Sequence, residues 1–297
     1  MLSALICAVA LAGCGGSSSA KPPADPTPAP TEQATVAAAK KIDRFNADRA
    51  WKMLDHQVKL GPRPAGSPQS KRLAAYIKAR LPRARYESVP GGLRNVVGVI
   101  PGKGKATVLA AHYDTKDLPG FVGANDGAGG TAAMLELARG LQKAKRGKNA
   151  PPIWFVAFDG EEATDDSDFL GTGVRGSKAF AKKHAKQIRE LTLLDFVANK
   201  GLAIPYEQSS NAAMWADLRA AAAKVGSAEQ FPDTRQGTVE DDHTPFLQRG
   251  IPAIDLIDFN FPCWHKTCDD LSAVSKASLD RSGEAVYAFL LMRSQAQ

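Results

Sequence analysis

The stretch TVLAAHYDTKDLPGFVGANDGAGGTAAMLELARGL, from Thr107 to Leu141, joins an apolar run to a glycine-rich turn and then to a run with helical spacing. The apolar run predicts a buried strand, with His112 and Asp114 at its exit. Asp126 stands just before the helix, among glycines that permit tight turning and close backbone approach. A strand, a turn with polar side chains and a helix form the unit from which α/β folds are built.

Two further stretches have the same character. FVAFDGEEA places Glu161 and Glu162 after another apolar run, and CWHKTCDD contains His265. Asp195 ends a third apolar run, LTLLD. Histidine and carboxylate side chains that follow buried strands in this way indicate a metal site.

The same alternation of strands and helices extends along the rest of the chain. Short extended segments are predicted at residues 85–89, 95–100, 107–112, 152–159, 191–197 and 251–258. Helical patterns cover residues 35–60, 69–81, 131–144, 176–190, 211–225 and 278–292. Apolar strands between amphipathic helices predict an α/β fold in which helices sandwich a largely parallel sheet. The sequence GKGK at 102–105 predicts a hairpin turn between two of the strands.

Length and charge limit the classes of function. The chain has 297 residues and a net charge of +7. Its Lys and Arg residues are scattered and have no aromatic residues between them, which is typical of a solvated basic face rather than a nucleic-acid surface. We therefore expect no nucleic-acid partner, and one large α/β domain from residue 35 to 297.

The N-terminus has a separate character. The apolar sequence MLSALICAVALAGC is too short to span a bilayer and resembles a bacterial lipoprotein signal at residues 1–13, with a lipid on Cys14. It lacks the basic residue that usually precedes such a run. Residues 14–34 are rich in Gly, Ser and Pro and predict a flexible tether. The expected location is outside the bacterial cytoplasmic membrane, or in the cell envelope, through a lipid anchor.

Two other cysteines, Cys263 and Cys268, lie close together in the sequence. Their spacing is compatible with a disulfide, which an exported protein can keep oxidised. The alternative is that they bind metal, but two thiols alone make a poor zinc site.

The candidate ligands follow the carboxyl ends of strands, where open α/β sheets bind their ligands. Asp114 is two residues beyond His112 and points the same way in an extended chain, so it could hold the second nitrogen of the imidazole. Glu161 and Glu162 face opposite ways, so one can bind metal while the other faces substrate. Nitrogen and oxygen ligands of this kind suit zinc. Taken singly, each residue has a plainer interpretation: a histidine at a strand end often only caps the surface, and paired Glu residues often only begin a helix.

The ordered segments HYDTKDLPGFVGANDGAGGTAAMLELARGL, FVAFDGEEA, LLDFVA, DDHTPFLQRGIPAIDLID and CWHKTCDD resemble the secreted zinc aminopeptidases and their relatives, the glutaminyl-peptide cyclotransferases. The resemblance runs from about Gly61 to the C-terminus. It implies a three-layer αβα sandwich with a mixed, mostly parallel central sheet. It also implies that the substrates are peptide or protein N-termini.

The resemblance also assigns roles to the candidate residues. In the aminopeptidases, positions matching His112 and Asp195 hold one zinc ion, those matching Glu162 and His265 hold the other, Asp126 bridges the two, and Glu161 is the general base. In the cyclotransferases one zinc ion is held by the positions matching Asp126, Glu162 and His265. There Glu161 moves the proton, with Asp195 and Asp241 in its hydrogen-bond chain.

Further features bear on which of the two branches the chain resembles more, and together they lead us to expect cyclisation. An insertion at 164–175, the acid Asp241, and Trp264, which could stack on a small flat substrate, are features of the cyclotransferases. Three features favour the aminopeptidases instead: no aromatic residue at 164–166, Glu240 where the cyclotransferases have an amide residue, and the cysteine pair around His265. A catalytically inactive, lipid-anchored binding protein is the remote alternative.

Overall fold

The computed structural model describes residues 44–294. The predicted signal at 1–13, Cys14, the tether at 14–34 and the start of the predicted domain at 35–43 lie outside the described residues. None of the helices in the described part is both long and apolar enough to cross a membrane.

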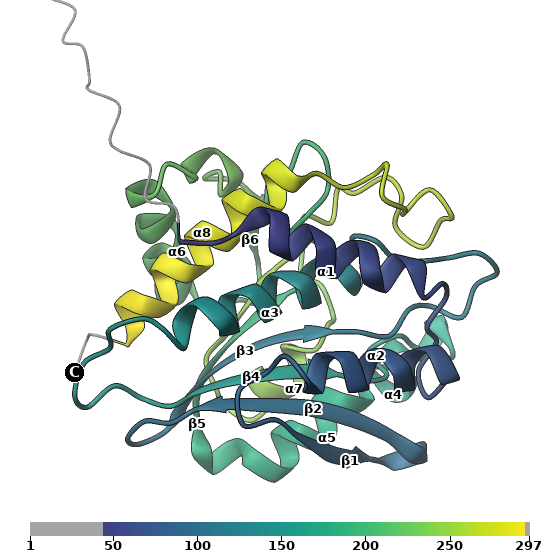
Figure 1. Cartoon of the computed structure of the whole chain (residues 1–297), viewed down its shortest axis with the longest axis horizontal. Helices are drawn as coiled ribbons and strands as arrows, with labels where there is room; N and C mark the ends of the chain where they lie inside the picture. Colours follow the sequence, from purple (N-terminus) through teal and green to yellow (C-terminus); the bar gives the residue numbers. More distant parts are fainter. Residues whose placement is uncertain (1–43, 295–297) are drawn as a thin grey trace, which may run out of the picture. The chain divides into compact units, whose positions relative to one another are not determined.

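A six-stranded sheet forms the centre of the described part (Figure 1). Its order is β1-β2-β4-β3-β5-β8, and the strands are β1 (Arg85–Val89), β2 (Leu93–Ile100), β3 (Ala106–His112), β4 (Ile153–Phe158), β5 (Ile188–Leu194) and β8 (Ala253–Leu256). The four strands from β4 to β8 are parallel, while β2 is antiparallel to both β1 and β4. The predicted mixed, mostly parallel sheet is therefore confirmed.

The predicted hairpin at GKGK is wrong, because β4 lies between β2 and β3 in the sheet. Ile153, the first residue of β4, pairs with Ile100 on one side and with Thr107 on the other. The turn therefore crosses the end of β4, where Lys103 N donates to Ala150 O over 2.9 Å. The apolar strand IWFVAF lies in the interior of the sheet because its backbone groups there form hydrogen bonds to a strand on each side while side chains are buried on both faces.

Alternate side chains of each strand enter two separate cores. In β3, Leu109 and Ala111 join the core under the helices α1 (Ala47–Lys59), α2 (Pro68–Lys78), α3 (Ala128–Leu141), α6 (Ala212–Lys224) and α8 (Lys276–Arg293). Val108 and Ala110 join the core under α5 (Arg175–His184) and α7 (Thr244–Leu247). Figure 1 shows α1, α3 and α8 on one side of the sheet and α5 on the other, which confirms the three layers.

Two predicted helices are shorter than their patterns. In the predicted helix at 35–60, residues 44–46 are not helical, because the Asn46 side chain accepts the N–H of Arg49 and starts α1 at Ala47. Of the helix predicted at 176–190, the observed helix α5 ends at His184, because Ile188 already pairs with Ala106 and begins β5. The strand predicted at 191–197 therefore begins three residues earlier and ends at Leu194.

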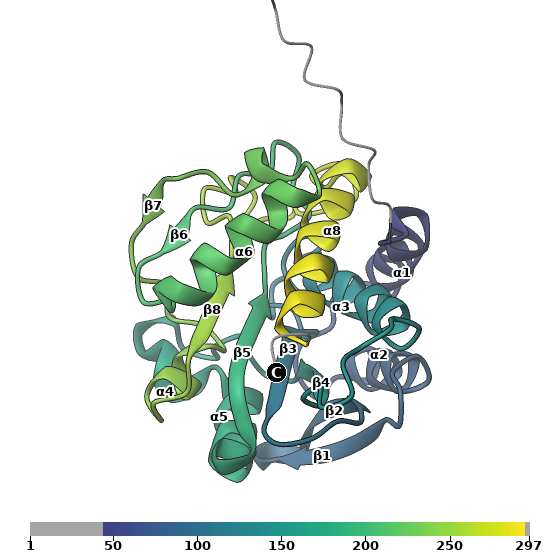
Figure 2. The ribbon, with the colours of Figure 1, turned by 90° about the vertical axis from the view of Figure 1, so that its left-hand side faces the viewer.

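The chain reverses its direction of progress across the sheet at β3. From β3 it passes through α3 to β4 on one side, and then through α5 to β5 on the other side of β3. Figure 2 shows β5 beside β8, and α6 beside α8. A crevice forms beyond the carboxyl ends of strands at such a switch point, and His112 is the last residue of β3.

Candidate metal centre

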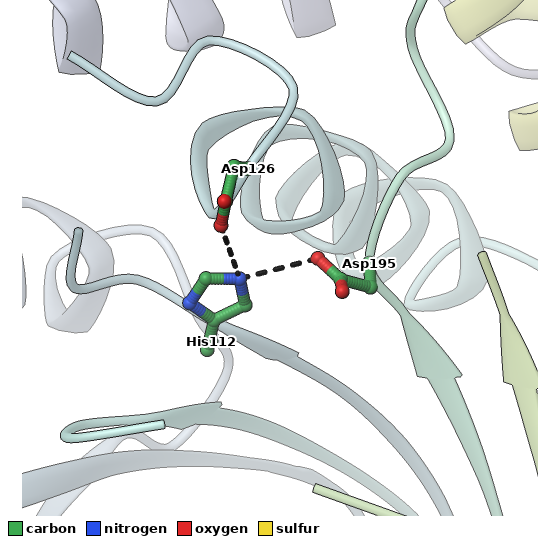
Figure 3. Close-up of side chains that lie close together, drawn as sticks. All are labelled: His112, Asp126 and Asp195. Carbon is green, nitrogen blue, oxygen red and sulfur yellow. Dashed lines mark hydrogen bonds and ion pairs between the residues drawn. The ribbon is translucent and has the colours of Figure 1, made fainter. Parts of the chain in front are cut away.

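The first group of candidate ligands is His112, Asp126 and Asp195 (Figure 3). The Nε2 atom of His112 lies 3.3 Å from Asp126 Oδ1 and 3.2 Å from Asp195 Oδ1. These residues come from the end of β3, the turn before α3 and the residue after β5. One imidazole nitrogen that faces two buried carboxylates is an arrangement suited to a divalent cation.

The second group is Asp126, Glu162 and His265. His265 Nε2 lies 3.2 Å from Glu162 Oε2 and 3.8 Å from Asp126 Oδ2. Asp126 therefore directs one carboxylate oxygen toward each group. A shared carboxylate between two sets of nitrogen and oxygen donors fits zinc, either as one ion or as a pair. The three expected ligands of each set are thus brought together.

Glycines let the turn before α3 carry Asp126 into the site. Gly127 has a φ of +88°, and a Cβ there would lie 2.7 Å from Asp114 O. A Cβ on Gly130 would lie 2.1 Å from Leu194 O, so only glycine lets α3 pack this closely on β5. Asp269 holds the other side of the turn, since its two oxygens accept the N–H groups of Asn125 and Asp126 over 2.8 and 3.0 Å.

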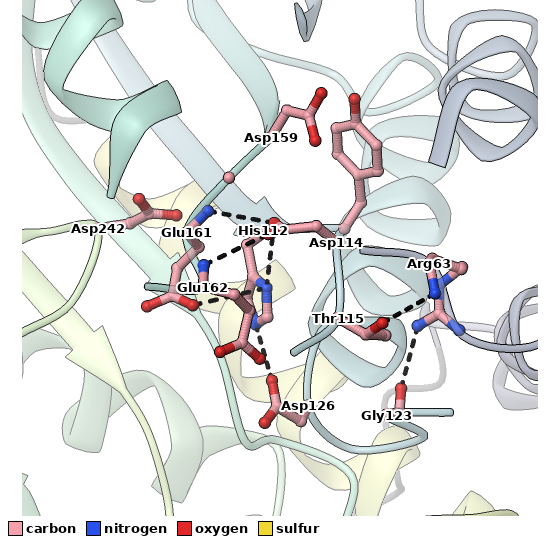
Figure 4. A network of polar contacts seen from close by, with 12 residues as sticks. Arg63, His112, Asp114, Thr115, Gly123, Asp126, Asp159, Glu161, Glu162 and Asp242 are labelled. Carbon is pink, nitrogen blue, oxygen red and sulfur yellow. Dashed lines mark hydrogen bonds and ion pairs between the residues drawn. The ribbon is translucent and has the colours of Figure 1, made fainter. Parts of the chain in front are cut away.

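The Asp114 carboxylate lies beside the backbone of the Glu pair (Figure 4). Its oxygens accept the N–H groups of Glu161 and Glu162 over 3.2 and 3.3 Å. Asp114 was expected to hold the second nitrogen of the His112 imidazole. Its Oδ1 atom lies 3.7 Å from His112 Nδ1, which is near but beyond hydrogen-bond distance. Asp114 therefore fixes the backbone of the Glu pair as well as facing the imidazole.

Glu161 and Glu162 are both buried and both line the pocket of the site. Burial raises the pKa of Glu161 well above its ordinary value, and the nearby Glu162 and Asp241 carboxylates add to this increase. Burial and the neighbouring Asp126 raise the pKa of Glu162 to about 7. Carboxylates crowded in this way are stabilised by a cation, which agrees with the metal-type donor set.

His265 lies in a short closed loop. Cys263 and Cys268 form the predicted disulfide, with Cα atoms 5.4 Å apart, so the alternative that they bind metal is excluded. His265 has a φ of +52°, an uncommon conformation for a residue other than glycine. The Trp264 ring stacks on it with centroids 4.6 Å apart, and the Phe121 ring meets its edge. The loop and these rings hold the imidazole toward Glu162.

The sequence did not reveal Arg63 as part of the site's support. Its side chain is fully buried and donates to the carbonyl oxygens of Gln57, Gly61, Val122 and Gly123. Burial lowers its pKa to about 10, while nearby Asp126, Asp269 and Asp114 favour the charged form. Arg63 thus joins the end of α1 to the loop before Asp126. In the sequence, only its position in the helix-breaking segment GPRP sets it apart.

A pocket of about 450 Å³ opens over the metal groups. Glu161, Asp195, Asp241 and Trp264, all expected in the site, line it together with candidate ligands Asp126, Glu162 and His265. Phe169 of α4 (Phe169–Thr172) also lines it. The insertion therefore supplies an aromatic ring just beyond 164–166, the positions at which the cyclotransferase resemblance implies one. Phe259 was likewise not foreseen; it contacts Trp264, and both rings are partly exposed.

Asp241 belongs to a third buried group, with His243 and Asp255. His243 Nε2 and Ser209 Oγ form a hydrogen bond of 2.9 Å, and His243 Nδ1 lies 3.8 Å from Asp255 Oδ2. Burial raises the pKa of Asp195, and the Asp241 carboxylate adds to this effect. Asp241 therefore acts on Asp195 and Glu161 through its charge. Its neighbours His243 and Asp255 were not among the residues expected in the site.

The sequence model of peptidase family M28 matches residues 95–290, which include every candidate ligand of both groups. The chain belongs to peptidase family M28. This M28 protein is also 30% identical to a glutaminyl-peptide cyclotransferase from Bothrops jararaca, over 83% of this chain and 81% of that protein. The resemblance to the zinc aminopeptidase and glutaminyl cyclase superfamily is confirmed.

Solved structures of both branches share the fold of this M28 protein. A glutaminyl cyclase from an Acidobacteriales bacterium has a TM-score of 0.74 and 29% identity, and the match covers 88% of this chain and 98% of that one. A leucine aminopeptidase precursor from Bacteroides thetaiotaomicron has a TM-score of 0.73 and 25% identity, covering 83% and 97% of the two chains. Their similar TM-scores mean that the backbone alone does not separate the two activities.

Proposed function

We propose that this M28 protein is a zinc-dependent glutaminyl-peptide cyclotransferase, which converts an N-terminal glutamine to pyroglutamate and releases ammonia. The observation that carries the proposal is the placement of buried Glu161 beside the group Asp126, Glu162 and His265 in one pocket. A general base next to a metal group is the arrangement that both branches of the family require. The cyclotransferase relatives favour cyclisation.

In the proposed reaction, Asp126, Glu162 and His265 would hold zinc, and bound zinc would polarise the side-chain amide carbonyl of the substrate. Glu161 takes a proton from the α-amine as the amine nitrogen bonds to the side-chain carbonyl carbon. Glu161 then gives the proton to the amide nitrogen, whose bond to that carbon breaks to release ammonia. The Asp241 carboxylate acts on Glu161 through its charge. Asp195 would stand with Asp241 in the hydrogen-bond chain of Glu161, and the partly exposed Trp264 ring would stack on the flat amide.

Hydrolysis by an aminopeptidase is the second candidate, favoured by the separate group His112, Asp126 and Asp195. Two complete donor sets that share a carboxylate suit a pair of ions, as the aminopeptidase branch uses. In that reaction Glu161 would take a proton from an attacking water and pass it to the leaving amine. One bound ion per chain would therefore favour cyclisation, and two would favour hydrolysis.

One incubation distinguishes these functions. Purified protein with zinc is given a Gln-peptide and a Leu-peptide in the same tube, and the products are read by mass. Cyclisation lowers the mass of the Gln-peptide by one ammonia, whereas hydrolysis releases a free amino acid. A chelated sample is the control, and elemental analysis gives the number of zinc ions. Release of leucine without pyroglutamate would refute the cyclase proposal, and no product from either peptide would favour the inactive binding protein.

We also propose that the protein is exported and held to the membrane by a lipid on Cys14. The signal-like sequence at 1–13 supports this proposal, and the Cys263–Cys268 disulfide is compatible with an oxidising compartment. Metabolic labelling with a fatty acid tests it. The wild-type protein should take up the label and Cys14→Ala should not, and an unlabelled wild type would contradict the anchor.

A further inference from the structure

The pocket over the metal groups has a charge opposite to that of the whole protein. Seven carboxyl side chains line it, and no Lys or Arg does: Asp126, Glu161, Glu162, Asp166, Asp195, Glu240 and Asp241. The chain as a whole has a net charge of +7. The acidic lining is therefore a local feature of the pocket.

Most of these carboxylates already have a partner or a role. Five of them belong to the candidate metal centre or lie deep beside it, and Asp166 forms an ion pair with Lys116. Glu240 differs, because it is exposed and its carboxylate forms no ion pair or hydrogen bond with another residue in the range 44–294. An uncompensated negative charge thus stands at the open part of the pocket.

Aromatic rings accompany this charge. Phe259 and Trp264 line the same pocket, with 38% and 43% of their surfaces exposed. Their centroids are 4.9 Å apart. Exposed aromatic rings in the same pocket as an unpaired carboxylate suit a lysine or arginine side chain, whose stem can pack on the rings while its cation faces the carboxylate.

We infer that Glu240 selects peptides with lysine or arginine in the two positions after the N-terminal residue. This inference rests on the proposed function for the orientation of the peptide: its N-terminal residue enters toward Glu161, so the following residues occupy the exposed mouth. The basic exterior opposes this preference only weakly, because salt screens charges more than about 8 Å apart at physiological ionic strength. Glu240 instead acts at contact distance.

The test compares tetrapeptide amides Gln-Lys-Lys-Phe, Gln-Ala-Ala-Phe and Gln-Glu-Glu-Phe by kcat/KM for pyroglutamate formation with zinc-loaded enzyme. Wild-type enzyme should prefer the Lys peptide over the Glu peptide by about three- to tenfold, which is the size expected for exposed charges in contact. Glu240→Gln should reduce this ratio by about threefold, and Glu240→Lys should bring it below one. The matched control Glu229→Gln removes an exposed carboxylate outside the pocket and should leave the ratio unchanged.

A second arm separates this inference from the proposed function. The same three peptides with N-terminal Leu are assayed for release of leucine, so the charge preference can be read whichever reaction occurs. If only the Leu series reacts, the cyclase proposal fails and the inference is judged on the Leu ratios. A ratio near one in wild type, or a ratio that Glu240→Lys does not change, overturns the inference. If neither series reacts, both fall.

Discussion

At the scale of single residues, Glu161 and Glu162 are neighbours that the proposed reaction uses differently. Asp114 accepts the N–H group of each, so both share one backbone support. Only Glu162 is near His265, at 3.2 Å, whereas Glu161 Oε2 lies 4.0 Å from His112 Nδ1. Variants of the two residues therefore allow a direct comparison between a proposed metal ligand and a proposed base.

We expect Glu161→Gln to keep zinc and lose about a hundred- to ten-thousand-fold in kcat, since Gln is nearly isosteric but cannot accept the proton. Glu162→Gln should bind zinc less tightly, because a charged ligand becomes neutral. Elemental analysis after dialysis and steady-state kinetics measure the two effects. A Glu161→Gln enzyme that keeps more than about a tenth of wild-type activity, or that loses zinc as readily as Glu162→Gln, would contradict the assignment.

At the scale of elements, the close contact between α3 and β5 controls the position of Asp126. A Cβ on Gly130 would meet the backbone oxygen of Leu194, which cannot move without displacing β5. We expect Gly130→Ala to reduce the free energy of unfolding by about 2 kcal/mol or more, as overpacking against a fixed backbone does. Zinc affinity should fall with it, because Asp126 stands four residues earlier, in the turn that leads into α3.

Urea unfolding and zinc titration measure these effects. Gly237→Ala is the control, since a Cβ there meets no atom within 4 Å and the backbone has no positive φ. That variant should unfold within about 0.5 kcal/mol of wild type. Equal stabilities for the two variants would show that α3 can shift without cost.

The disulfide loop is the second element on which the site depends. Opening it in the double variant Cys263→Ser, Cys268→Ser should cost only about 2 kcal/mol, because the closed loop is short. The larger effect should be on zinc affinity, since His265 holds a φ of +52° that the open loop no longer enforces. Calorimetry and zinc titration give the two values, and unchanged zinc affinity would show that the neighbouring rings alone position His265.

At the scale of the whole molecule, the buried carboxyl groups make stability depend on zinc and on pH together. In chelated protein, burial raises the pKa of Glu162 to about 7, and burial with the nearby Asp126 raises that of Asp269 to about 7. At neutral pH the folded protein therefore keeps protons on these carboxyl groups that the unfolded chain has already released, because carboxyl groups in the unfolded chain have their ordinary pKa of about 4. Stability is therefore lost as the pH rises from about 4 to 7.

Zinc removes this loss at Glu162, because a metal ligand is stable in its charged form. We expect zinc to raise Tm by an amount that grows between pH 5 and pH 8, and that also grows with free zinc concentration. Thermal unfolding at several pH values, with zinc or with chelator, measures this. A zinc effect that is constant over that pH range would contradict the placement of Glu162 as a ligand.

The sequence by itself determined the repeating local features of this protein. Apolar runs within 107–112 and 152–159 predicted buried strands, and every strand of the main sheet was found near its pattern. The ligand types at the strand exits, the disulfide and the superfamily could also be predicted. These features depend on residues close together in the chain, whose spacing carries the signal.

Only the tertiary structure decided which segments are neighbours. It placed β4 between β2 and β3, where a hairpin was expected, and it brought Arg63 into contact with the turn before Asp126. It also placed His243 and Asp255 beside Asp241. Strand order and burial depend on how all the elements fill two shared cores at once, and a residue such as Arg63 gains its role from carbonyl groups up to 60 positions away.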